Sequence, residues 1–388
     1  MFLDVTLKRN KKLVETAFEL HQSGIIEPDT FIIDADSVLY NAECIKKEGD
    51  RYGIKLYFMT KQIGRNPYIA SELMKLGYDG AVAVDWREAQ LLSENNIKIG
   101  HAGHLVQIPS GKIESILLER PEVITVYSVE KAKQISDAAK RLGITQNIML
   151  RAIDEGDILY PAQYGGFYIK EIAENAEKIA SLPNINIYGI TSFPCFLFNP
   201  ESKKIEKTKN MDTLLIAKEI LESKLGLKLH EINAPSCTCT SIIKKIHDCG
   251  GTHGEPGHGL TGTTPLHAVS DQVEIPSIVY VSEISHNLDK SCYCYGGGYY
   301  RRSNAANAIV GKNICSAGRF KIEKPSMESI DYYFELSGHA DVGDTVIFAN
   351  RSQIFVTRSH VAVVKGIQKD SPQVVGIYDS LGRIIEKN

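Results

Sequence analysis

Eight short apolar segments alternate with helical segments along this chain, and that alternation limits its fold more than any other feature. The segments predicted as strands are residues 55–60, 80–85, 97–103, 123–128, 147–153, 185–193, 229–235 and 250–257. The stretches between them have helical periodicity, and several end at a glycine (Gly77, Gly143 and Gly226), a common residue after a helix. Short strands separated by helices predict parallel βαβ units. Eight of them favour a closed (β/α)8 TIM barrel over an open sheet.

The pattern changes near residue 273. Segments 277–285, 291–297, 332–338, 344–350 and 354–366 are rich in β-branched and aromatic residues, with glycine and Asn/Asp turns between them. Long helices are not evident there, which predicts a C-terminal all-β domain. We expect an α/β protein with an N-terminal amphipathic helix in residues 1–28, a barrel in 29–272 and the β domain in 273–388.

The charge balance argues against nucleic acid or a membrane as a partner. Lys and Arg number 44 against 47 Asp and Glu, a formal net charge of −3, so the chain has no basic surplus. No apolar run is long enough to span a bilayer, and the N-terminus lacks the apolar core of a signal peptide. We therefore expect a cytoplasmic protein whose 8 cysteines are reduced thiols.

Two C-x-C pairs, Cys237/Cys239 and Cys292/Cys294, invite comparison with zinc sites. Structural zinc sites space their ligands by two to four residues, so one intervening residue is a poor match. On a strand, the same spacing places two small side chains on one face. We expect no metal at these pairs, and zinc binding is kept as the alternative.

Side chains at the C-terminal ends of barrel strands are the candidates for chemistry, because that face holds the active site of such barrels. The candidates are Lys61, Asp85, His101, Arg151, Asp154, Thr191, Ser192, Asn233, Ser236, Glu255, Gly257 and His258. A lysine near a cation or in a dry pocket becomes a nucleophile and a base, and Arg65 follows Lys61 by four residues. Taken alone, Lys61 is better explained as a solvated strand end than as a catalytic residue.

The segment GEPGHGLTGTTP, residues 254–265, interleaves glycines with Thr261, Thr263 and Thr264. Backbone N–H groups at glycines, together with hydroxyl groups, can bind a phosphate, although the Gly-Lys-Ser/Thr of a P-loop is missing. A glycine-rich turn between domains is the alternative. A lysine, an acid and a phosphate site at one end of a barrel indicate pyridoxal 5′-phosphate, which needs all three.

These motifs resemble the fold-type III pyridoxal-phosphate enzymes, which include alanine racemase, D-threonine aldolase and ornithine decarboxylase. The likeness runs from DTFIIDADSVLYNAECIKK to the C-terminus. YFMTKQ, LRAIDEGD, NAPSCTC and EPGHG are similar to four barrel segments of that family. The resemblance implies that Lys61 bonds covalently to the cofactor and that Glu255 contacts its ring nitrogen. The remaining residues that it implies for cofactor binding are Arg151, Ser236, Gly257, His258, Thr261, Gly262, Thr263 and Tyr299.

The β domain extends the resemblance. YCYGGGYYRR, residues 293–302, is similar to the racemase segment that carries a second base. On this alignment Tyr295 would act from the partner subunit, which implies a head-to-tail homodimer with shared active sites. A half-buried strand tyrosine is the alternative for Tyr295.

Three departures from the family bear on the reaction. Glu255 stands where alanine racemase has an arginine, and a carboxylate would keep the ring nitrogen protonated, which leaves the reaction type open. Ser359 and His360 stand where D-threonine aldolases have their last pair of metal ligands, which argues against metal-dependent aldolase or dehydratase chemistry. Residues 296–298 replace the Cys-Asp of the decarboxylase interface, which weakens decarboxylation.

The leading hypothesis is a pyridoxal-phosphate-dependent amino-acid racemase or epimerase, an isomerase that uses Lys61 and Tyr295 as bases on opposite faces of Cα. Arg65, Arg151, Arg301 or Arg358 would bind the substrate carboxylate. The alternatives are a decarboxylase or another enzyme that cleaves a bond at Cα, a non-catalytic protein that binds the cofactor, and a barrel without a cofactor.

Overall fold

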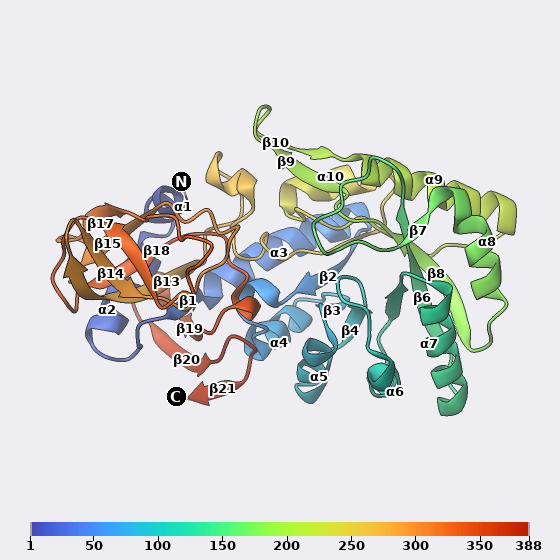
Figure 1. Ribbon diagram of the computed structural model, residues 1–388, viewed down its shortest axis with the longest axis horizontal. Coiled ribbons are helices and arrows are strands. Elements are labelled where there is room, and N and C mark those ends of the chain that lie inside the picture. The colour runs from blue at the N-terminus through green and yellow to red at the C-terminus, as the bar shows by residue number, and fades with distance from the viewer. Residues whose placement is uncertain (1, 387–388) are drawn as a thin grey trace. The chain divides into compact units, whose positions relative to one another are not determined.

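The computed structural model describes residues 2–386, and residues 55–254 contain a closed barrel of parallel strands (Figure 1). Around the ring the strands are β2 (Lys55–Met59), β3 (Gly80–Ala83), β4 (Ile99–Ala102), β5 (Val123–Val126), β6 (Gln146–Ile153), β8 (Ile185–Thr191), β11 (Glu231–Asn233) and β12 (His253–Gly254). β12 pairs with β2 and closes the ring. Seven of the strands fall within predicted segments and β6 begins one residue before its segment, so the predicted (β/α)8 fold is confirmed.

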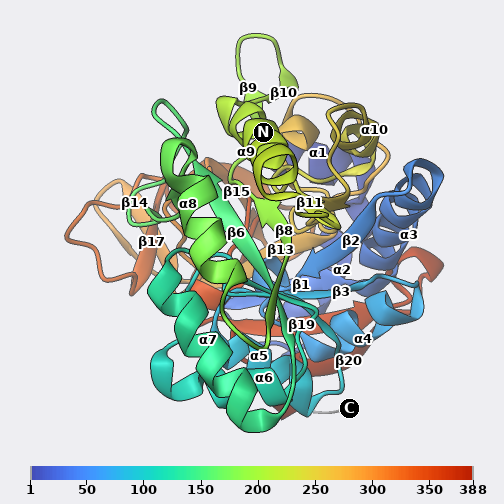
Figure 2. The same cartoon turned by 90° about the vertical axis from the view of Figure 1, so that its right-hand side faces the viewer.

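Helices cover the outside of the ring; α3 precedes β2, and each of the others follows a barrel strand. They are α3 (Ala35–Tyr52), α4 (Pro67–Lys75), α5 (Trp86–Glu94), α6 (Ile113–Leu118), α7 (Val129–Leu142), α8 (Ile169–Ala180), α9 (Lys209–Leu225) and α10 (Thr240–Asp248). Figure 2 shows α7 and α8 alongside β6 and β8, which they contact. Ser128 caps the N-terminus of α7, and Gly143 ends the same helix at φ +66°, as the pattern predicted. Three short strands, β7 (Phe167–Tyr168), β9 (Phe196–Asn199) and β10 (Lys204–Lys207), lie outside the ring.

The C-terminal part forms a mainly antiparallel sheet, which confirms the predicted all-β domain. Its C-terminal strands are β13 (Ile278–Leu288), β14 (Ser291–Tyr295), β15 (Asn307–Gly311), β16 (Gly318–Lys321), β17 (Tyr333–Ser337), β18 (Thr345–Phe348), β19 (His360–Lys365), β20 (Gln373–Tyr378) and β21 (Ile384–Glu386). β14 pairs with β13 and with β17. Cys292 and Cys294 lie on β14 with both side chains buried, whereas Cys237 and Cys239 lie in the loop before α10.

The N-terminal residues join this sheet rather than the barrel. β1 (Thr30–Asp34) pairs with β13 and with β19, although the sequence placed these residues in the barrel domain. The expected single N-terminal helix is two helices, α1 (Phe2–Arg9) and α2 (Lys11–Gln22), because Asn10 begins a new helix by accepting a hydrogen bond from the N–H of Leu13. By contacts, residues 2–43, 61–69 and 258–386 form one compact unit, and 44–60 and 70–257 form the other.

The two units have different interiors. In the first, apolar residues of α1 and α2, such as Phe2, Leu13 and Phe18, pack with residues of the sheet, such as Val279 and Ile347. The barrel interior instead contains polar and charged side chains, where Val, Ile and Leu are usual. Within residues 2–386, no helix combines the length and the apolar content needed to cross a membrane.

Candidate active site

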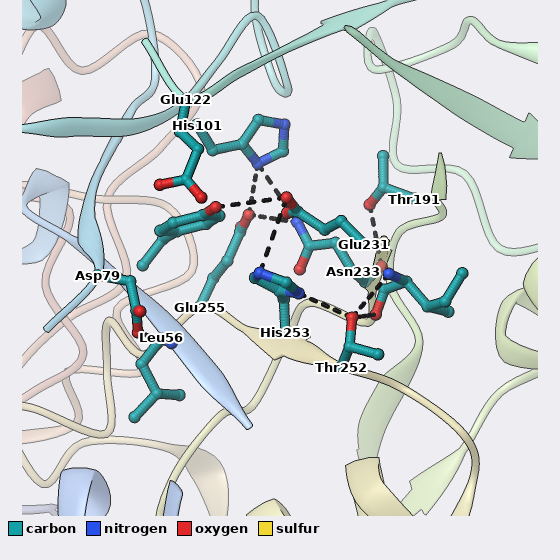
Figure 3. A network of polar contacts seen from close by, with 12 residues as sticks. Leu56, Asp79, His101, Glu122, Thr191, Glu231, Asn233, Thr252, His253 and Glu255 are labelled. Carbon is teal, nitrogen blue, oxygen red and sulfur yellow. Dashed lines mark hydrogen bonds and ion pairs between the residues drawn. The ribbon is translucent and has the colours of Figure 1, made fainter. Parts of the chain in front are cut away.

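The carboxylate of Glu255 lies inside the barrel at the C-terminal end of β12 (Figure 3). Its Oε1 atom accepts hydrogen bonds from Nδ1 of His101 and Nδ2 of Asn233, both at 2.7 Å. The backbone N–H of Glu255 donates to Oγ1 of Thr238 at 3.1 Å. Among the described residues, no hydrogen bond is made by Oε2, so a bound group can use this oxygen.

Glu255 is ionised although it is buried. Burial raises the pKa of this carboxyl group, but the charges of His104 and His101 and the hydrogen bonds from His101 and Asn233 lower it to about 2. The rings of His101 and His104 lie 4.9 Å apart, centroid to centroid. The barrel therefore holds one negative charge at the end of β12 throughout the physiological pH range.

A second buried carboxyl group, that of Glu231, lies on β11 two residues before Asn233. Its Oε2 atom accepts a hydrogen bond from the hydroxyl of Tyr57 at 3.3 Å, and Nε2 of His253 is 3.8 Å away. Burial, assisted by the charges of Glu255 and Glu122, raises the pKa of Glu231 well above its usual range. Burial also lowers the pKa of His253 to about 3. His253 is therefore neutral at pH 7, and Glu231 keeps its proton to a higher pH than an ordinary carboxyl group.

Arg151 is a buried cation on β6, and two of its nitrogens can make further hydrogen bonds. The side chain is 1% exposed, and its Nη1 atom donates to the hydroxyl of Tyr127 at 3.0 Å. The guanidinium also lies over the Tyr127 ring, 5.0 Å from the centroid. In residues 2–386, the buried Nε and Nη2 atoms have no hydrogen-bond partner. An anionic oxygen of a ligand would satisfy them.

Lys61 lies two residues after the end of β2 and begins a single turn of 3₁₀ helix, residues Lys61–Ile63. In the first unit, the carbonyl of Gln62 accepts a hydrogen bond from Oγ of Ser352 at 2.9 Å. Gly64 adopts φ +65°, where a Cβ atom would lie 2.8 Å from Val361, so the turn requires glycine. Arg65, at φ +53°, is 2% exposed and its guanidinium lies 5.2 Å from the Phe355 ring centroid. The turn that carries Lys61 is therefore held firmly.

Chain connectivity keeps Lys61 close to the strand pair that leads to Glu255. Two residues before Lys61, the N–H of Met59 donates to the carbonyl of Pro256 at 2.8 Å. Pro256 follows Glu255 in the chain. The backbone of Lys61 is thus separated from this hydrogen bond by Thr60 alone, as expected for the first and last strands of a closed barrel.

His258 begins the turn that contains the predicted phosphate-binding threonines. Its carbonyl accepts a hydrogen bond from the N–H of Thr263 at 2.9 Å, and its Nδ1 atom lies 3.1 Å from Oγ1 of the same residue. Thr261 and Thr263 join their hydroxyls at 2.7 Å. Gly262 adopts φ +61°, and a Cβ there would lie 2.4 Å from the carbonyl oxygen of Ile275. This backbone therefore needs a glycine at position 262.

The imidazole of His258 is neutral. Desolvation lowers the pKa of His258 well below its usual range, and the positive charges of Arg351, Lys61 and Arg302 lower it further. These cations belong to the same compact unit as His258. The structure thus brings Lys61 and His258 into one electrostatic cluster and adds Arg351 and Arg302 to it.

Two further predicted phosphate ligands lie after β11 and β12. Ser236, at φ +116°, donates its hydroxyl to the carbonyl of Phe196. Gly257 is buried and directly precedes His258. Their roles in binding a phosphate remain predictions, and the hydroxyl of Ser236 would have to leave Phe196 to take part.

Tyr295 lies at the end of β14, and its side chain is 39% exposed. Within the described residues its phenol oxygen makes no hydrogen bond, while its ring lies 5.9 Å from that of Tyr333. The following glycines are held by Asp331, whose Oδ2 atom accepts hydrogen bonds from the N–H groups of Gly297 and Tyr299, both at 3.1 Å. The phenol of Tyr295 is therefore exposed, while hydrogen bonds to Asp331 fix the backbone that follows it.

The arginines predicted to bind substrate differ in their surroundings. Arg358 is exposed, and its Nη2 atom donates to the carbonyl of Asp331 at 2.5 Å. Arg301 is also exposed, whereas Arg65 is buried. Ser359 donates to the carboxylate of Asp29. In residues 2–386, no three His, Cys, Asp or Glu side chains gather as a metal site would require.

Several residues of this site escaped the sequence reasoning. His101 and Asn233 stood among the strand ends without a role, and the structure joins both to Glu255. Asp85, another strand-end candidate, caps α5 by accepting from the N–H of Glu88. His104, Glu231 and Arg351 carried no signal, apart from the period of two that places Glu231 on the same strand face as Asn233.

The donor set fits pyridoxal phosphate. Oε2 of the ionised Glu255 can hold a proton at the ring nitrogen, and the two unsatisfied nitrogens of Arg151 suit an anionic oxygen. Lys61, Arg351 and Arg302 supply positive charge next to the turn of Thr261–Thr263. A lysine, an anion site and an acid are the groups that this cofactor needs from a protein.

Known proteins resemble this chain over nearly its whole length. Residues 33–265 match the family of the alanine racemase N-terminal domain, and residues 279–374 match the YhfX-like C-terminal domain. Over 387 residues the chain is 41% identical to the uncharacterized protein YhfX of Escherichia coli K12, which covers 98% of this chain and 99% of that protein.

Solved structures with the same fold catalyse different reactions. D-threonine aldolase from Filomicrobium marinum matches with a TM-score of 0.67 at 14% identity. The match covers 92% of this chain and 95% of the aldolase chain. Alanine racemase from Clostridium difficile 630 has a TM-score of 0.64 at 16% identity, with 92% and 99% covered. D-threo-3-hydroxyaspartate dehydratase from Delftia sp. HT23 has a TM-score of 0.67 at 14% identity, with 89% and 96% covered. At these identities the likeness establishes the fold and leaves the reaction open.

Proposed function

The chain belongs to the family of the alanine racemase N-terminal domain, the fold-type III enzymes that depend on pyridoxal phosphate, and on this premise we propose that it is an amino-acid racemase or epimerase. Lys61 and Tyr295 of the partner subunit would be its two bases. The observation that carries the proposal is the ionised carboxylate of Glu255, buried at the end of β12 with Oε2 available.

Pyridoxal phosphate, when bound, supplies a ring that withdraws electrons from Cα of an amino acid. Glu255 would contribute by keeping a proton on the ring nitrogen, since its pKa of about 2 leaves the carboxylate ionised at every pH at which the protein would work. His101 and Asn233 hold Oε1, which would leave Oε2 to contact the bound group. A protonated ring acidifies the Cα proton most strongly, which benefits any reaction that removes it.

Inversion needs a base on each face of Cα, both within reach of the same proton. The amine of Lys61 would remove or return the proton on one face, and the rigid turn of Lys61–Ile63 supports this role because it restricts where the amine can lie. The phenol of Tyr295 would act on the other face. Its exposure on β14 supports a role in the active site of a second subunit, in a head-to-tail homodimer.

The anionic groups of cofactor and substrate would be bound by separate residues. Ser236, Gly257, His258, the turn of Thr261–Thr263 and Tyr299 would contact the cofactor. Of the candidates for the substrate carboxylate, Arg151 is favoured by its two unsatisfied buried nitrogens. Arg358 is disfavoured because it already donates to Asp331. A cytoplasmic location is supported by the 8 cysteines, because none of them forms a disulfide within residues 2–386.

The test is to incubate purified protein, loaded with pyridoxal phosphate, with each L- and D-amino acid in deuterated water. We expect chiral chromatography to show inversion of at least one amino acid, with deuterium entering at Cα. Lys61→Ala should abolish both inversion and the absorbance of the bound cofactor. If no amino acid is inverted by cofactor-loaded protein, the racemase proposal is wrong.

A decarboxylase or another enzyme that cleaves a bond at Cα is the second candidate, favoured by Glu255 because a protonated ring stabilises a carbanion however it arises. Release of CO₂ from a substrate in the same incubations would identify a decarboxylase. A protein that binds the cofactor and changes no amino acid would be a carrier instead.

A further inference from the structure

The charge of His258 determines whether this residue can neutralise the phosphate of the cofactor. In the resemblance described above, it stands where decarboxylases have an arginine that binds the cofactor phosphate. A neutral imidazole cannot replace that positive charge, and desolvation keeps His258 neutral. A phosphate carries close to two negative charges at pH 7, so another cation is needed nearby.

The three-residue segment Arg351–Gln353 reaches both parts of the predicted phosphate site. Ser352, 1% exposed, donates its hydroxyl to the carbonyl of Gln62, next to Lys61, at 2.9 Å. Nε2 of Gln353 lies 3.4 Å from Nε2 of His258. The residue before them, Arg351, is therefore fixed beside the Lys61 turn and His258. All of these residues belong to one compact unit.

The positive charge of Arg351 acts on the imidazole of His258. Of the charged groups that act on the His258 imidazole, the Arg351 guanidinium is the strongest, followed by Lys61 and Arg302. The backbone N–H of Arg351 donates to the carbonyl of Ser303 at 3.0 Å, which ties it to the neighbour of Arg302. Arg351 and Arg302 therefore lie near each other and act on the same side chain, His258.

We propose that Arg351, assisted by Arg302, binds the phosphate group of the cofactor and replaces the arginine that is absent at position 258. A guanidinium suits this role because its paired N–H groups match two phosphate oxygens. His258 then serves as a neutral neighbour that contacts Gln353 and Thr263. The inference rests on pyridoxal phosphate as the cofactor, and it holds whichever reaction follows.

The test compares pyridoxal phosphate with pyridoxal, which lacks the phosphate. Full-length protein is freed of cofactor by dialysis against hydroxylamine, and each compound is titrated while absorbance reports binding. For Arg351→Gln we expect the Kd for pyridoxal phosphate to rise about tenfold or more, while the Kd for pyridoxal stays within about twofold. Arg351→Lys, which keeps the charge, should weaken binding less, as should Arg302→Gln.

Arg319→Gln is the matched control, because Arg319 is an exposed arginine of the same unit that pairs with Asp4. Circular dichroism checks folding, and Arg351→Lys carries the comparison if Arg351→Gln does not fold. Substitution of Arg351 without any change in the preference for pyridoxal phosphate over pyridoxal would overturn the proposal. Wild-type protein that binds neither compound would contradict the cofactor as well, whereas binding without inversion contradicts only the racemase reaction.

Discussion

At the scale of single residues, the surroundings of each carboxyl group decide its charge. Glu255 is ionised because imidazole and amide groups point at it, whereas the pKa of Glu231 is raised because the side chain is buried and lies near other acids. Asp29, the residue before β1, has a carboxyl group that is buried like that of Glu231 and accepts hydrogen bonds like that of Glu255. Its Oδ1 atom accepts hydrogen bonds from the hydroxyls of Tyr280, at 2.9 Å, and of Ser359, yet burial still raises its pKa to about 6.

We predict that Asp29→Asn stabilises the protein more at pH 8 than at pH 4.5. A carboxyl pKa of about 6 in the folded state lies above the unfolded value of 3.8, so the folded protein binds more protons between these values. The stability that Asp29 contributes is therefore present below pH 4 and is lost as pH rises through 6. Asn is neutral at both pH values, can accept the same hydrogen bonds, and tolerates φ +62°.

Thermal denaturation of wild type and Asp29→Asn at both pH values measures this effect. The difference in unfolding free energy between the two proteins should grow by about 2 kcal/mol from pH 4.5 to pH 8. Asp341→Asn, an exposed substitution in the same unit, is the control and should show no such growth. A difference that is the same at both pH values would mean that Asp29 titrates normally.

At the scale of elements, the glycines after β14 depend on a residue far away in the sequence. Asp331 lies just before β17, and the pairing of Tyr295 with Tyr333 brings β14 and β17 together. This pairing places the carboxylate of Asp331 where it accepts from the N–H groups of Gly297 and Tyr299. Gly297 cannot be replaced, because a Cβ would lie 1.7 Å from Oδ2 of Asp29.

We predict that Asp331→Ala loosens the segment that carries Tyr295 and Tyr299. Losing two hydrogen bonds to a charged acceptor costs roughly 2 kcal/mol or more locally, so the amides of Gly297 and Tyr299 should exchange with deuterium at least about tenfold faster. If Tyr295 is a catalytic base, kcat should fall while the cofactor absorbance is unchanged.

Hydrogen exchange followed by mass spectrometry on peptides covering residues 293–302 measures the loosening without any assay of activity. Asp341→Ala serves as the matched control, since Asp341 is exposed. Unchanged exchange in Asp331→Ala would show that other contacts hold the loop.

At the scale of the whole molecule, the proposed reaction requires two copies of the chain. Tyr295 would serve the partner's Lys61, so each active site would combine residues from two subunits. A symmetric dimer built in this way has a property that a monomer lacks. Two inactive variants, each damaged in a different half of the site, can restore one intact site when they pair.

We predict that Lys61→Ala and Tyr295→Phe complement each other. Each variant alone should be inactive, and a mixture refolded or co-expressed in equal amounts should regain about a quarter of wild-type activity, since half of the dimers are mixed and each has one intact site. Inversion assayed by chiral chromatography measures the recovery. Mixing Lys61→Ala with itself is the control, and a mixture as inactive as its parts would place both residues in one chain or remove Tyr295 from catalysis.

The sequence predicted the barrel and part of the site for the same reason. Strand and helix periodicity are local properties, and the eight predicted segments each contain a strand. Lys61 and Glu255 could be singled out because active-site residues follow strand ends in such barrels. Arg351 and Asp331 could not, since each makes hydrogen bonds with residues more than thirty positions away in the chain, Arg351 with Ser303 and Asp331 with Gly297.

The sequence by itself thus determined the order of strands and helices, the two kinds of domain, the cofactor, and the lysine and acid that would serve it. Tertiary structure decided that β1 joins the C-terminal sheet, that Glu255 is ionised while His258 is neutral, and that Arg351 lies beside the Lys61 turn. The physical reason is the range over which each kind of interaction acts. Backbone propensity acts over a few residues along the chain, whereas strand pairing, desolvation and Coulomb interaction depend on distances in space, which only the folded chain sets.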